Sequence, residues 1–353
     1  MRRLLGLILA GALVAPVMVS MQLLAQAPAP RPNIVLIMSD DMGWADLGVY
    51  GGKDIKTPNI DSLARDGTRL TDFYSNGVLC SPTRAGLISG RYQQRYAIEN
   101  ALAGEGTFGL KVTGNSLPQL LKNNGYATAL VGKWHLGGTV SGDKPKEGGP
   151  RAHGFDYFFG FMGSHDDYWH HNRGPMAPDL WENETMINLD GQYLTTLITD
   201  RTMKFMEQNA AARRPFFIDV AYNAPHWPYQ RPDKPSPPPG TGNHQLADQE
   251  NTATRDDYRV MLEAVDSGVG QILRKLDQLG LSNNTLVIFT NDNGGEWLAN
   301  GGPLFNRKWT TWEGGIRVPA IFKWPGRIPR GKVSDQVGIT MDLSATLVAA
   351  AGG

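Results

Sequence analysis

Four mostly apolar runs recur along the chain, at positions 33–38, 127–131, 216–221 and 286–290. They are short and rich in Val, Ile, Leu and Phe, as is typical of strands that are buried on both faces of a sheet. Stretches with helical periodicity lie between them. Strands that alternate with helices predict an α/β fold with a mostly parallel central sheet and helices on both faces.

The clearest predicted helix covers residues 254–280, where apolar side chains recur at steps of three and four residues. Thr254 and Asp257 have the spacing of a capping box, and Gly280 is placed to end the helix. Shorter helices are predicted at residues 57–67, 116–125 and 193–208.

Aromatic residues and histidines crowd the stretch from residue 155 to residue 172. We interpret this stretch as a loop that shapes a substrate pocket. Zinc binding is the alternative, but the histidines in and near it lack a convincing ligand spacing; they are His153, His165, His170 and His171.

The charge balance of the 353-residue chain narrows the range of partners. The chain contains 34 basic and 34 acidic residues, so its formal net charge is zero. Binding to nucleic acid phosphates usually requires a basic excess, so we expect no nucleic-acid partner. A locally positive pocket for a small anionic group stays compatible with this composition.

The N-terminus has the features of a secretory signal peptide. Arg2 and Arg3 precede an apolar run over residues 4–24, and an Ala-Gln-Ala cleavage site ends at residue 27. An uncleaved anchor is the alternative, because the run is long, but Pro16 and the small residues favour cleavage. We therefore expect an exported protein, periplasmic or secreted, with a signal peptide at residues 1–27 and no stable membrane insertion after cleavage.

Acidic residues directly follow two of the predicted strands. Asp40 and Asp41 come after the first strand, and Asp292 with Asn293 come after the last. The carboxyl ends of parallel strands share one edge of a sheet, where functional sites gather; the alternative for Asp40 and Asp41 is a simple turn. Carboxylates that converge repel each other unless a cation offsets them, and all-oxygen ligands favour Ca²⁺, with Mg²⁺ as the second choice.

Cys80 is the single cysteine of the chain, so it cannot form an internal disulfide. Pro82 and the apolar residues after it predict that a helix begins here. Cys80 then lies at a helix N-terminus, where backbone N–H groups and the helix dipole stabilise a developing negative charge. The alternative is a buried cysteine that serves only packing.

The segment Cys80-x-Pro82-x-Arg84, followed by Ala-Gly-Leu-Ile-Ser-Gly-Arg, resembles the signature of the type I, formylglycine-dependent sulfatases of the alkaline phosphatase superfamily. Thr83 and Ser89 stand where serine and threonine are usual in that family, and both keep a hydroxyl. Further matches follow in family order; they are Gly132-Lys133-Trp134-His135-Leu136-Gly137, His226 beside prolines, and Lys308 ahead of Glu313-Gly314-Gly315-x-Arg317-x-Pro319.

This resemblance implies a role for each matched residue. Cys80 would be oxidised to formylglycine by a formylglycine-generating or maturase enzyme, and the hydrated aldehyde would be the nucleophile. The metal ligands would be Asp40, Asp41, Asp292, Asn293 and the modified Cys80. The sulfate would be held by Arg84, Lys133 and Lys308. His226 would protonate the departing alcohol, and His135 would accept a proton from the remaining hydroxyl.

The resemblance also suggests a substrate and a domain layout. The spacing is most similar to arylsulfatases and N-acetylgalactosamine-6-sulfatases, which implies a sulfated carbohydrate or an aryl sulfate as substrate. Two alternatives stay open: a phosphodiester or phosphonate monoester hydrolase of the same superfamily, and an inactive protein that binds sulfated glycans. Residues 28–353 are expected to form a C-terminally truncated catalytic domain, because family members usually continue into a smaller domain.

Overall fold

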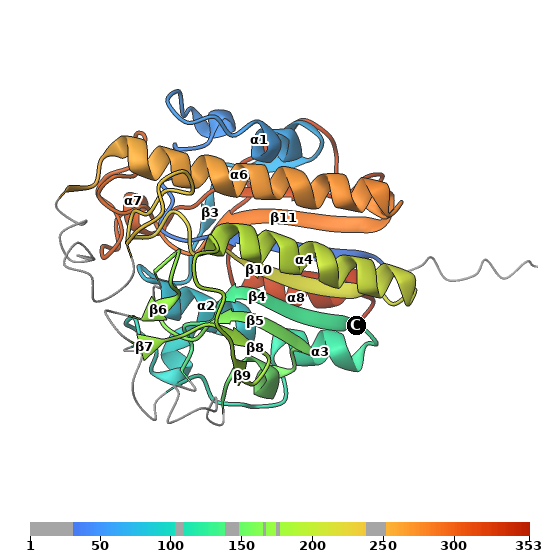
Figure 1. Ribbon diagram of the computed structural model, residues 1–353. Coiled ribbons are helices and arrows are strands. Elements are labelled where there is room, and N and C mark those ends of the chain that lie inside the picture. Colours follow the sequence, from blue (N-terminus) through green and yellow to red (C-terminus); the bar gives the residue numbers. More distant parts are fainter. Residues whose placement is uncertain (1–30, 103–108, 138–147, 165–166, 174–176, 238–251) are drawn as a thin grey trace, which may run out of the picture. The chain divides into compact units, whose positions relative to one another are not determined.

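Four parallel strands form the centre of the fold, and they coincide with the four predicted apolar runs. They are β1 (Asn33–Ser39), β4 (Ala127–Lys133), β10 (Phe216–Ala221) and β11 (Thr285–Asn291), and every residue in them is buried. Their order in the sheet is β11–β1–β10–β4. The predicted parallel centre is confirmed in this computed structural model, which describes residues 31–102, 109–137, 148–164, 167–173, 177–237 and 252–353 (Figure 1).

Shorter strands extend this sheet on both sides. Within the described residues the sheet has ten strands, in the order β13–β2–β12–β11–β1–β10–β4–β5–β8–β9. β5 (Tyr157–Phe161) continues the parallel part next to β4, whereas β12 beside β11 and β8 beside β5 run antiparallel. The other added strands are β2 (Thr68–Leu70), β8 (Trp181–Glu182), β9 (Thr185–Met186), β12 (Ala320–Lys323) and β13 (Lys332–Ser334).

Strand β5 corrects one prediction from the sequence. Residues 155–172 do not form a single loop, because residues 157–161 form a strand of the sheet in which Phe158, Phe159 and Phe161 are fully buried. The run Tyr-Phe-Phe-Gly-Phe is packed on both faces, like the four central strands. Its short length and its internal glycine weaken the strand pattern in the sequence.

Helices cover both faces of the sheet, as predicted. Successive side chains of β1 point to opposite faces, with Val35 and Ile37 in one core cluster and Leu36 and Met38 in the other. The first face is covered by α1 (Pro58–Arg65), α4 (Leu194–Ala211) and α6 (Arg255–Gln278). The second face is covered by α2 (Cys80–Ser89), α3 (Leu117–Asn123) and α8 (Asp342–Ala350).

Helix α6 begins and ends as its sequence predicts. The Thr254 side chain accepts a hydrogen bond from the Asp257 N–H (3.3 Å), and the Asp257 carboxylate accepts one from the Thr254 N–H (2.9 Å), which completes the capping box. Gly280 has a φ of +69°, the left-handed conformation that follows many helices. α6 packs against α4, and the two helices lie side by side in Figure 1.

Short elements complete the described part of the chain. They are the strands β3 (Phe73–Tyr74), β6 (Asn172–Arg173), β7 (Ala177–Pro178) and β14 (Gly338–Ile339), the helix α7 (Glu313–Ile316), and the 3₁₀ helices η1 (Gly48–Tyr50), η2 (Gln93–Tyr96), η3 (Pro150–His153) and η4 (Ser282–Asn284). None of the helices in the described residues combines the length and the hydropathy that a membrane span requires. The predicted signal peptide lies outside the described residues.

One carboxyl group lies inside the sheet itself. Asp219 is on β10, between Leu36 of β1 and Leu130 of β4 in the strand register, and only 4% of it is exposed. Its Oδ1 atom is buried and has no hydrogen-bond partner among the described residues. Burial, which the charge of Arg84 offsets only in part, raises the pKa of Asp219 to about 7.

We predict that Asp219→Asn gains stability relative to the wild type as the pH rises. The unfolded carboxyl ionises near pH ~4, whereas the folded one keeps its proton up to about pH 7. Ionisation of the carboxyl therefore lowers the free energy of unfolding of the wild type progressively between the two pKa values. Above the pKa of the folded state the loss is complete. From about pH 5 to about pH 7 the difference between variant and wild type should grow by roughly 2 kcal/mol, as measured by urea unfolding. A difference that does not change with pH contradicts the assignment.

Candidate active site

Acidic residues from the two ends of the chain meet at one edge of the sheet. β1 and β11 are paired in register, with Ser39 beside Asn291, so the residues that follow them leave the sheet together. The Asp41 N–H donates to Asp292 Oδ1 (3.4 Å), and Asn293 Nδ2 donates to Asp41 Oδ1 (2.7 Å). All of them are buried, as is Asp40. Asp40, Asp41 and Asp292 form the acidic cluster.

Asn291 fixes this edge of the sheet, a role that is not predicted from its sequence. Its Oδ1 accepts hydrogen bonds from the Ser39 hydroxyl (2.8 Å) and the Met42 N–H (3.2 Å), and its Nδ2 donates to the Met42 carbonyl (3.0 Å). The turn after β1 is therefore bonded to the end of β11 through a side chain. The sequence feature that could have predicted this role is the position of Asn291, which ends an apolar run directly before Asp292.

Cys80 is the first residue of α2, as predicted, and it is buried beside the acidic cluster. Its Sγ lies 3.5 Å from Asp40 Oδ1. Burial, together with the neighbouring Asp40, raises the pKa of the thiol far above its usual range. An unmodified thiol is therefore a weak nucleophile here, because reactivity requires the thiolate.

Three buried cations pair one to one with the acidic cluster. The pairs are Lys133 with Asp40 (2.5 Å), Lys308 with Asp41 (2.6 Å) and Arg84 with Asp292 (2.9 Å). Arg84 also lies 3.4 Å from Asp40, so it bridges the acids that follow the first and last strands. Burial alone would lower the pKa of both lysines, but the carboxylates raise it, so both lysines stay protonated.

The backbone before Lys133 requires a glycine. Gly132 is in β4 with a φ of +123°, and a Cβ on it would lie 1.9 Å from the Ala221 carbonyl oxygen of β10. No side chain fits in that space. The glycine therefore lets β4 stay paired with β10 while the next residue, Lys133, reaches the acidic cluster.

The three cations balance the charge of the acidic cluster but do not fully offset the cost of burying its carboxylates. Burial raises the pKa of Asp41 despite the opposing charge of Lys308, and burial with the nearby Asp40 raises the pKa of Asp292. A further positive charge in the cluster would lower the pKa of both carboxyl groups and stabilise their ionised forms. The acidic cluster therefore has the electrostatic property of a cation site.

The donor atoms fit a hard divalent cation. Asp40, Asp41, Cys80 and His226 each place a ligand atom within 4.8 Å of the others. Asn293 Oδ1 is buried and has no hydrogen-bond partner among the described residues, so it offers one more oxygen. Carboxylate and amide oxygens are the ligands that Ca²⁺ and Mg²⁺ prefer.

His135 has the properties of a proton acceptor. Its Nε2 lies 3.0 Å from the Leu102 carbonyl oxygen, so Nε2 carries the proton and Nδ1 keeps a free lone pair. Nδ1 is buried and has no hydrogen-bond partner in the described part of the chain. Burial, followed by the charges of Lys133 and Arg84, lowers the pKa of His135 well below its usual value. His135 can be predicted from the sequence but its Leu102 partner cannot, because a backbone carbonyl has no side-chain signature.

His226 faces the acidic cluster from the loop after β10. Its Nε2 lies 3.4 Å from Asp41 Oδ2, and its Nδ1 lies 2.5 Å from the Trp227 carbonyl oxygen. Both ring nitrogens thus lie near oxygen atoms that can accept a hydrogen bond. The loop is held by Tyr168, whose hydroxyl lies 3.0 Å and 2.8 Å from the carbonyls of Asn223 and His226.

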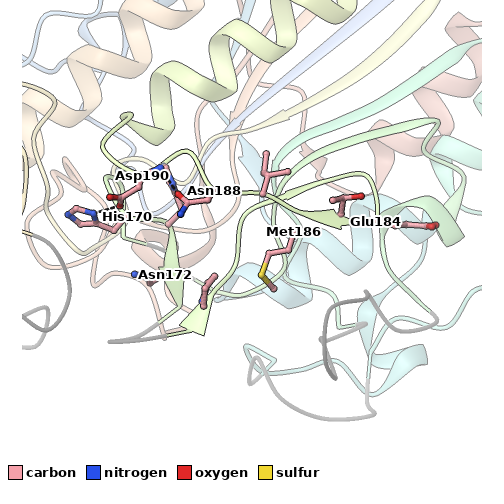
Figure 2. Close-up of a pocket in the computed structure, with 10 residues that line it drawn as sticks. His170, Asn172, Glu184, Met186, Asn188 and Asp190 are labelled. Atoms are coloured by element: carbon pink, nitrogen blue, oxygen red, sulfur yellow. Dashed lines mark hydrogen bonds and ion pairs between the residues drawn. The ribbon is translucent and has the colours of Figure 1, made fainter.

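The other described histidines join no metal-binding cluster in the described residues, and His165 lies outside those residues. His170 Nδ1 pairs with Asp190 Oδ1 at 2.5 Å. Both side chains line a cavity of about 640 Å³ close to β6 and β9 (Figure 2). Residues 170–172 of the stretch that predicts a substrate pocket thus border a cavity, and the use of this cavity by a substrate stays a prediction.

Comparison with known families matches residues 32–353 to the family described as Sulfatase. The chain belongs to the sulfatase family. N-acetylgalactosamine-6-sulfatase of Canis lupus familiaris is 38% identical over 93% of this chain and 63% of its own length. Arylsulfatase G of Mus musculus is 34% identical over 92% of this chain and 66% of its own length. The sulfatase-family chain thus spans about two thirds of the length of these relatives.

Solved structures share the fold of this sulfatase-family chain. The crystal structure of Ps i-CgsB in complex with k-i-k-neocarrahexaose has a TM-score of 0.80 and 34% identity, over 91% of this chain and 72% of that one. The phosphonate monoester hydrolase of Agrobacterium radiobacter has a TM-score of 0.61 and 20% identity, over 91% and 74%. The second likeness concerns the fold alone. The sheet and its helices thus have the architecture of the alkaline phosphatase superfamily.

We predict that Lys308→Met destabilises the metal-free protein by about 3–5 kcal/mol at neutral pH, because it leaves Asp41 as an uncompensated buried charge. The loss should shrink in acid, where Asp41 takes up a proton. Adding Asp41→Asn removes the charge and should restore most of the lost stability. Urea unfolding of the single and double variants with a chelator present measures these effects. A single variant as stable as the wild type contradicts the pairing.

Proposed function

We propose that this sulfatase-family protein hydrolyses sulfate esters. The observation that carries the proposal is a buried cysteine at a helix N-terminus, surrounded by three fixed cations and by carboxylates suited to a divalent ion. Arg84, Lys133 and Lys308 bind the sulfate oxygens and stabilise the charge that develops as the S–O bond breaks. Three acids and three cations leave the site without net charge, and a bound divalent cation makes it positive, which favours an anionic ester.

Residue 80 supplies the nucleophile in this proposal. Once a formylglycine-generating or maturase enzyme has converted Cys80 to formylglycine, the aldehyde hydrate provides one hydroxyl that attacks sulfur and a second that permits release of sulfate. The first turn of α2 supports this placement, because its free N–H groups stabilise negative charge at residue 80. The raised pKa of the thiol supports it as well, since unmodified Cys80 stays protonated.

Two histidines divide the proton transfers. His226, whose two ring nitrogens both face acceptors, donates the Nε2 proton to the departing alcohol oxygen as its bond to sulfur breaks. His135, neutral and with a free lone pair on Nδ1, accepts a proton when the sulfate leaves. A paired acid and base require one group placed to donate a proton and another with a free lone pair to accept one.

The cation that the donor set favours is Ca²⁺, with Mg²⁺ as the second choice. Asp40, Asp41 and Asn293 would hold it together with the oxygen of the modified residue 80. Asp292, whose Oδ1 lies 3.4 Å from the Asp41 N–H, would be the remaining ligand. When bound, the cation supplies charge stabilisation and lowers the pKa of the attacking hydroxyl.

The substrate we propose is a sulfated carbohydrate, with simple aryl sulfates as surrogates. The relatives' names support this choice, because one is an N-acetylgalactosamine-6-sulfatase and a similar structure holds a neocarrahexaose. Phosphodiester or phosphonate hydrolysis has only the support of a fold-level likeness at 20% identity. We place the reaction outside the cytoplasm, in the periplasm or the medium, because residues 1–27 have the pattern of a signal peptide.

We predict multiple turnover only after residue 80 is modified. Protein produced with a maturase should show formylglycine at position 80 by mass spectrometry and should hydrolyse 4-nitrophenyl sulfate continuously, with a higher kcat/KM than for bis(4-nitrophenyl) phosphate. Cys80→Ser should stop after at most one turnover, because a serine ester lacks the second hydroxyl.

Sustained turnover by Cys80→Ser would falsify this scheme. A higher kcat/KM for the phosphodiester would favour the hydrolase alternative. An unmodified thiol in protein made with its maturase, combined with tight binding of sulfated glycan, would favour the inactive binding protein.

Calcium should bind to the acidic cluster. We predict that calorimetry of the wild type detects one Ca²⁺ site, and that Asp41→Asn weakens it by about 100-fold because a ligand charge is lost. Asp54→Asn, which alters a carboxylate paired with Arg255 at the surface, is the matched control and should leave the affinity unchanged. Equal Ca²⁺ affinities of the wild type and both variants would show that calcium does not bind at the acidic cluster.

A further inference from the structure

Three large aromatic side chains on one loop are exposed to solvent. Phe305, Trp309 and Trp312 lie between β11 and α7 and are 66%, 62% and 58% exposed. Phe305 and Trp312 contact each other edge to face, with ring centroids 5.2 Å apart. Large aromatic side chains that are exposed to solvent on one loop can mark a site of binding.

Trp309 differs from the other two because it borders the proposed sulfate site. The Lys308 Nζ lies 5.9 Å from the centroid of the indole ring and 2.6 Å from Asp41 Oδ2. The Trp309 N–H donates to the carbonyl of Val78, in the segment that leads into α2 (3.1 Å). The indole Nε1–H donates to Glu296 Oε2 (3.3 Å). The ring is therefore oriented by the protein, next to a cation that binds sulfate in the proposed function.

The backbone of Trp309 is held in an unfavourable conformation. Its φ is +76°, in the left-handed region that bulky residues rarely adopt. Asp41 and His135 of this site also have positive φ values, +63° and +55°, as do five other non-glycine residues in the described part of the chain. At Trp309 the strain is not offset by burial of the side chain. Conformations of this kind concentrate where a side chain is aimed at a ligand.

We propose that Trp309 is a stacking platform for the sugar ring that carries the sulfate ester. This inference rests on the proposed function, since the sulfate must sit against Lys308. The ester oxygen joins sulfate and sugar, so a sulfate held by Lys308 brings its pyranose next to the indole ring. One face of a pyranose such as galactose presents C–H groups, which pack on the electron-rich face of an aromatic ring.

The platform also explains why an exposed indole is useful beside a buried anion site. In the proposed function Arg84, Lys133 and Lys308 contact the sulfate group, which an ester shares with free sulfate, so these cations do not by themselves select the sugar. A flat apolar surface at the edge of the site adds recognition of the alcohol that bears the sulfate. Trp309 thereby makes the site bind sulfated sugars in preference to small inorganic anions.

The test is calorimetry on protein made without a maturase, which keeps the Cys80 thiol and cannot turn over. With calcium present, galactose 6-sulfate should bind about tenfold more tightly than inorganic sulfate. Trp309→Ala should abolish this preference while leaving the affinity for inorganic sulfate unchanged, and Trp309→Phe should keep most of it. Trp312→Ala is the matched control, because it removes an equally exposed indole from the same loop and should have no effect.

The outcomes separate this inference from the proposed function. Failure of both anions to bind the wild type contradicts the sulfate site and therefore the proposed function. Equal affinities of the wild type for the two anions, or a preference that survives in Trp309→Ala, overturns the platform alone. Equal losses in Trp309→Ala and Trp312→Ala also overturn it, because the effect would then belong to the loop or to another segment that covers it.

Discussion

The site depends on the compensation of buried charge at the carboxyl edge of the sheet. Three carboxylates and three cations, none of them more than 4% exposed, are held there in direct contact. Removing such groups from water is costly, and each is tolerated because a partner of opposite charge lies beside it. In the function that we propose, the same pairing preorganises the cations for the sulfate, because their positions are fixed before the anion arrives.

The parallel sheet is what gathers these groups from distant parts of the chain. Asp40 and Asp292 follow neighbouring strands, and Lys133 ends the strand two places away on the same sheet. Helix α2 contributes Cys80 at its first residue and Arg84 one turn later, so the helix N-terminus and one of the cations arrive together. A change in the register of any central strand would therefore separate charges that stabilise one another.

Much of this arrangement can be predicted from the sequence, and the limits have a physical cause. Apolar runs that end in acids predict the strands and the meeting of Asp40 with Asp292, and Cys80 is recognised by the proline and arginine that follow it. Contacts made by the backbone leave no such pattern, as with the Leu102 carbonyl that orients His135. The positive φ of Trp309 and the exposure of its side chain also cannot be predicted from the sequence, because they depend on the backbone conformation and on residues distant in sequence.

The most direct test of the charge-compensation account is a crystal structure of the matured protein grown with calcium and inorganic sulfate. The account predicts a cation bound by Asp40, Asp41 and Asn293, with residue 80 against it and the sulfate in contact with Lys133 and Lys308. A cation bound elsewhere, or Asp40 and Asp292 separated from residue 80, would contradict it.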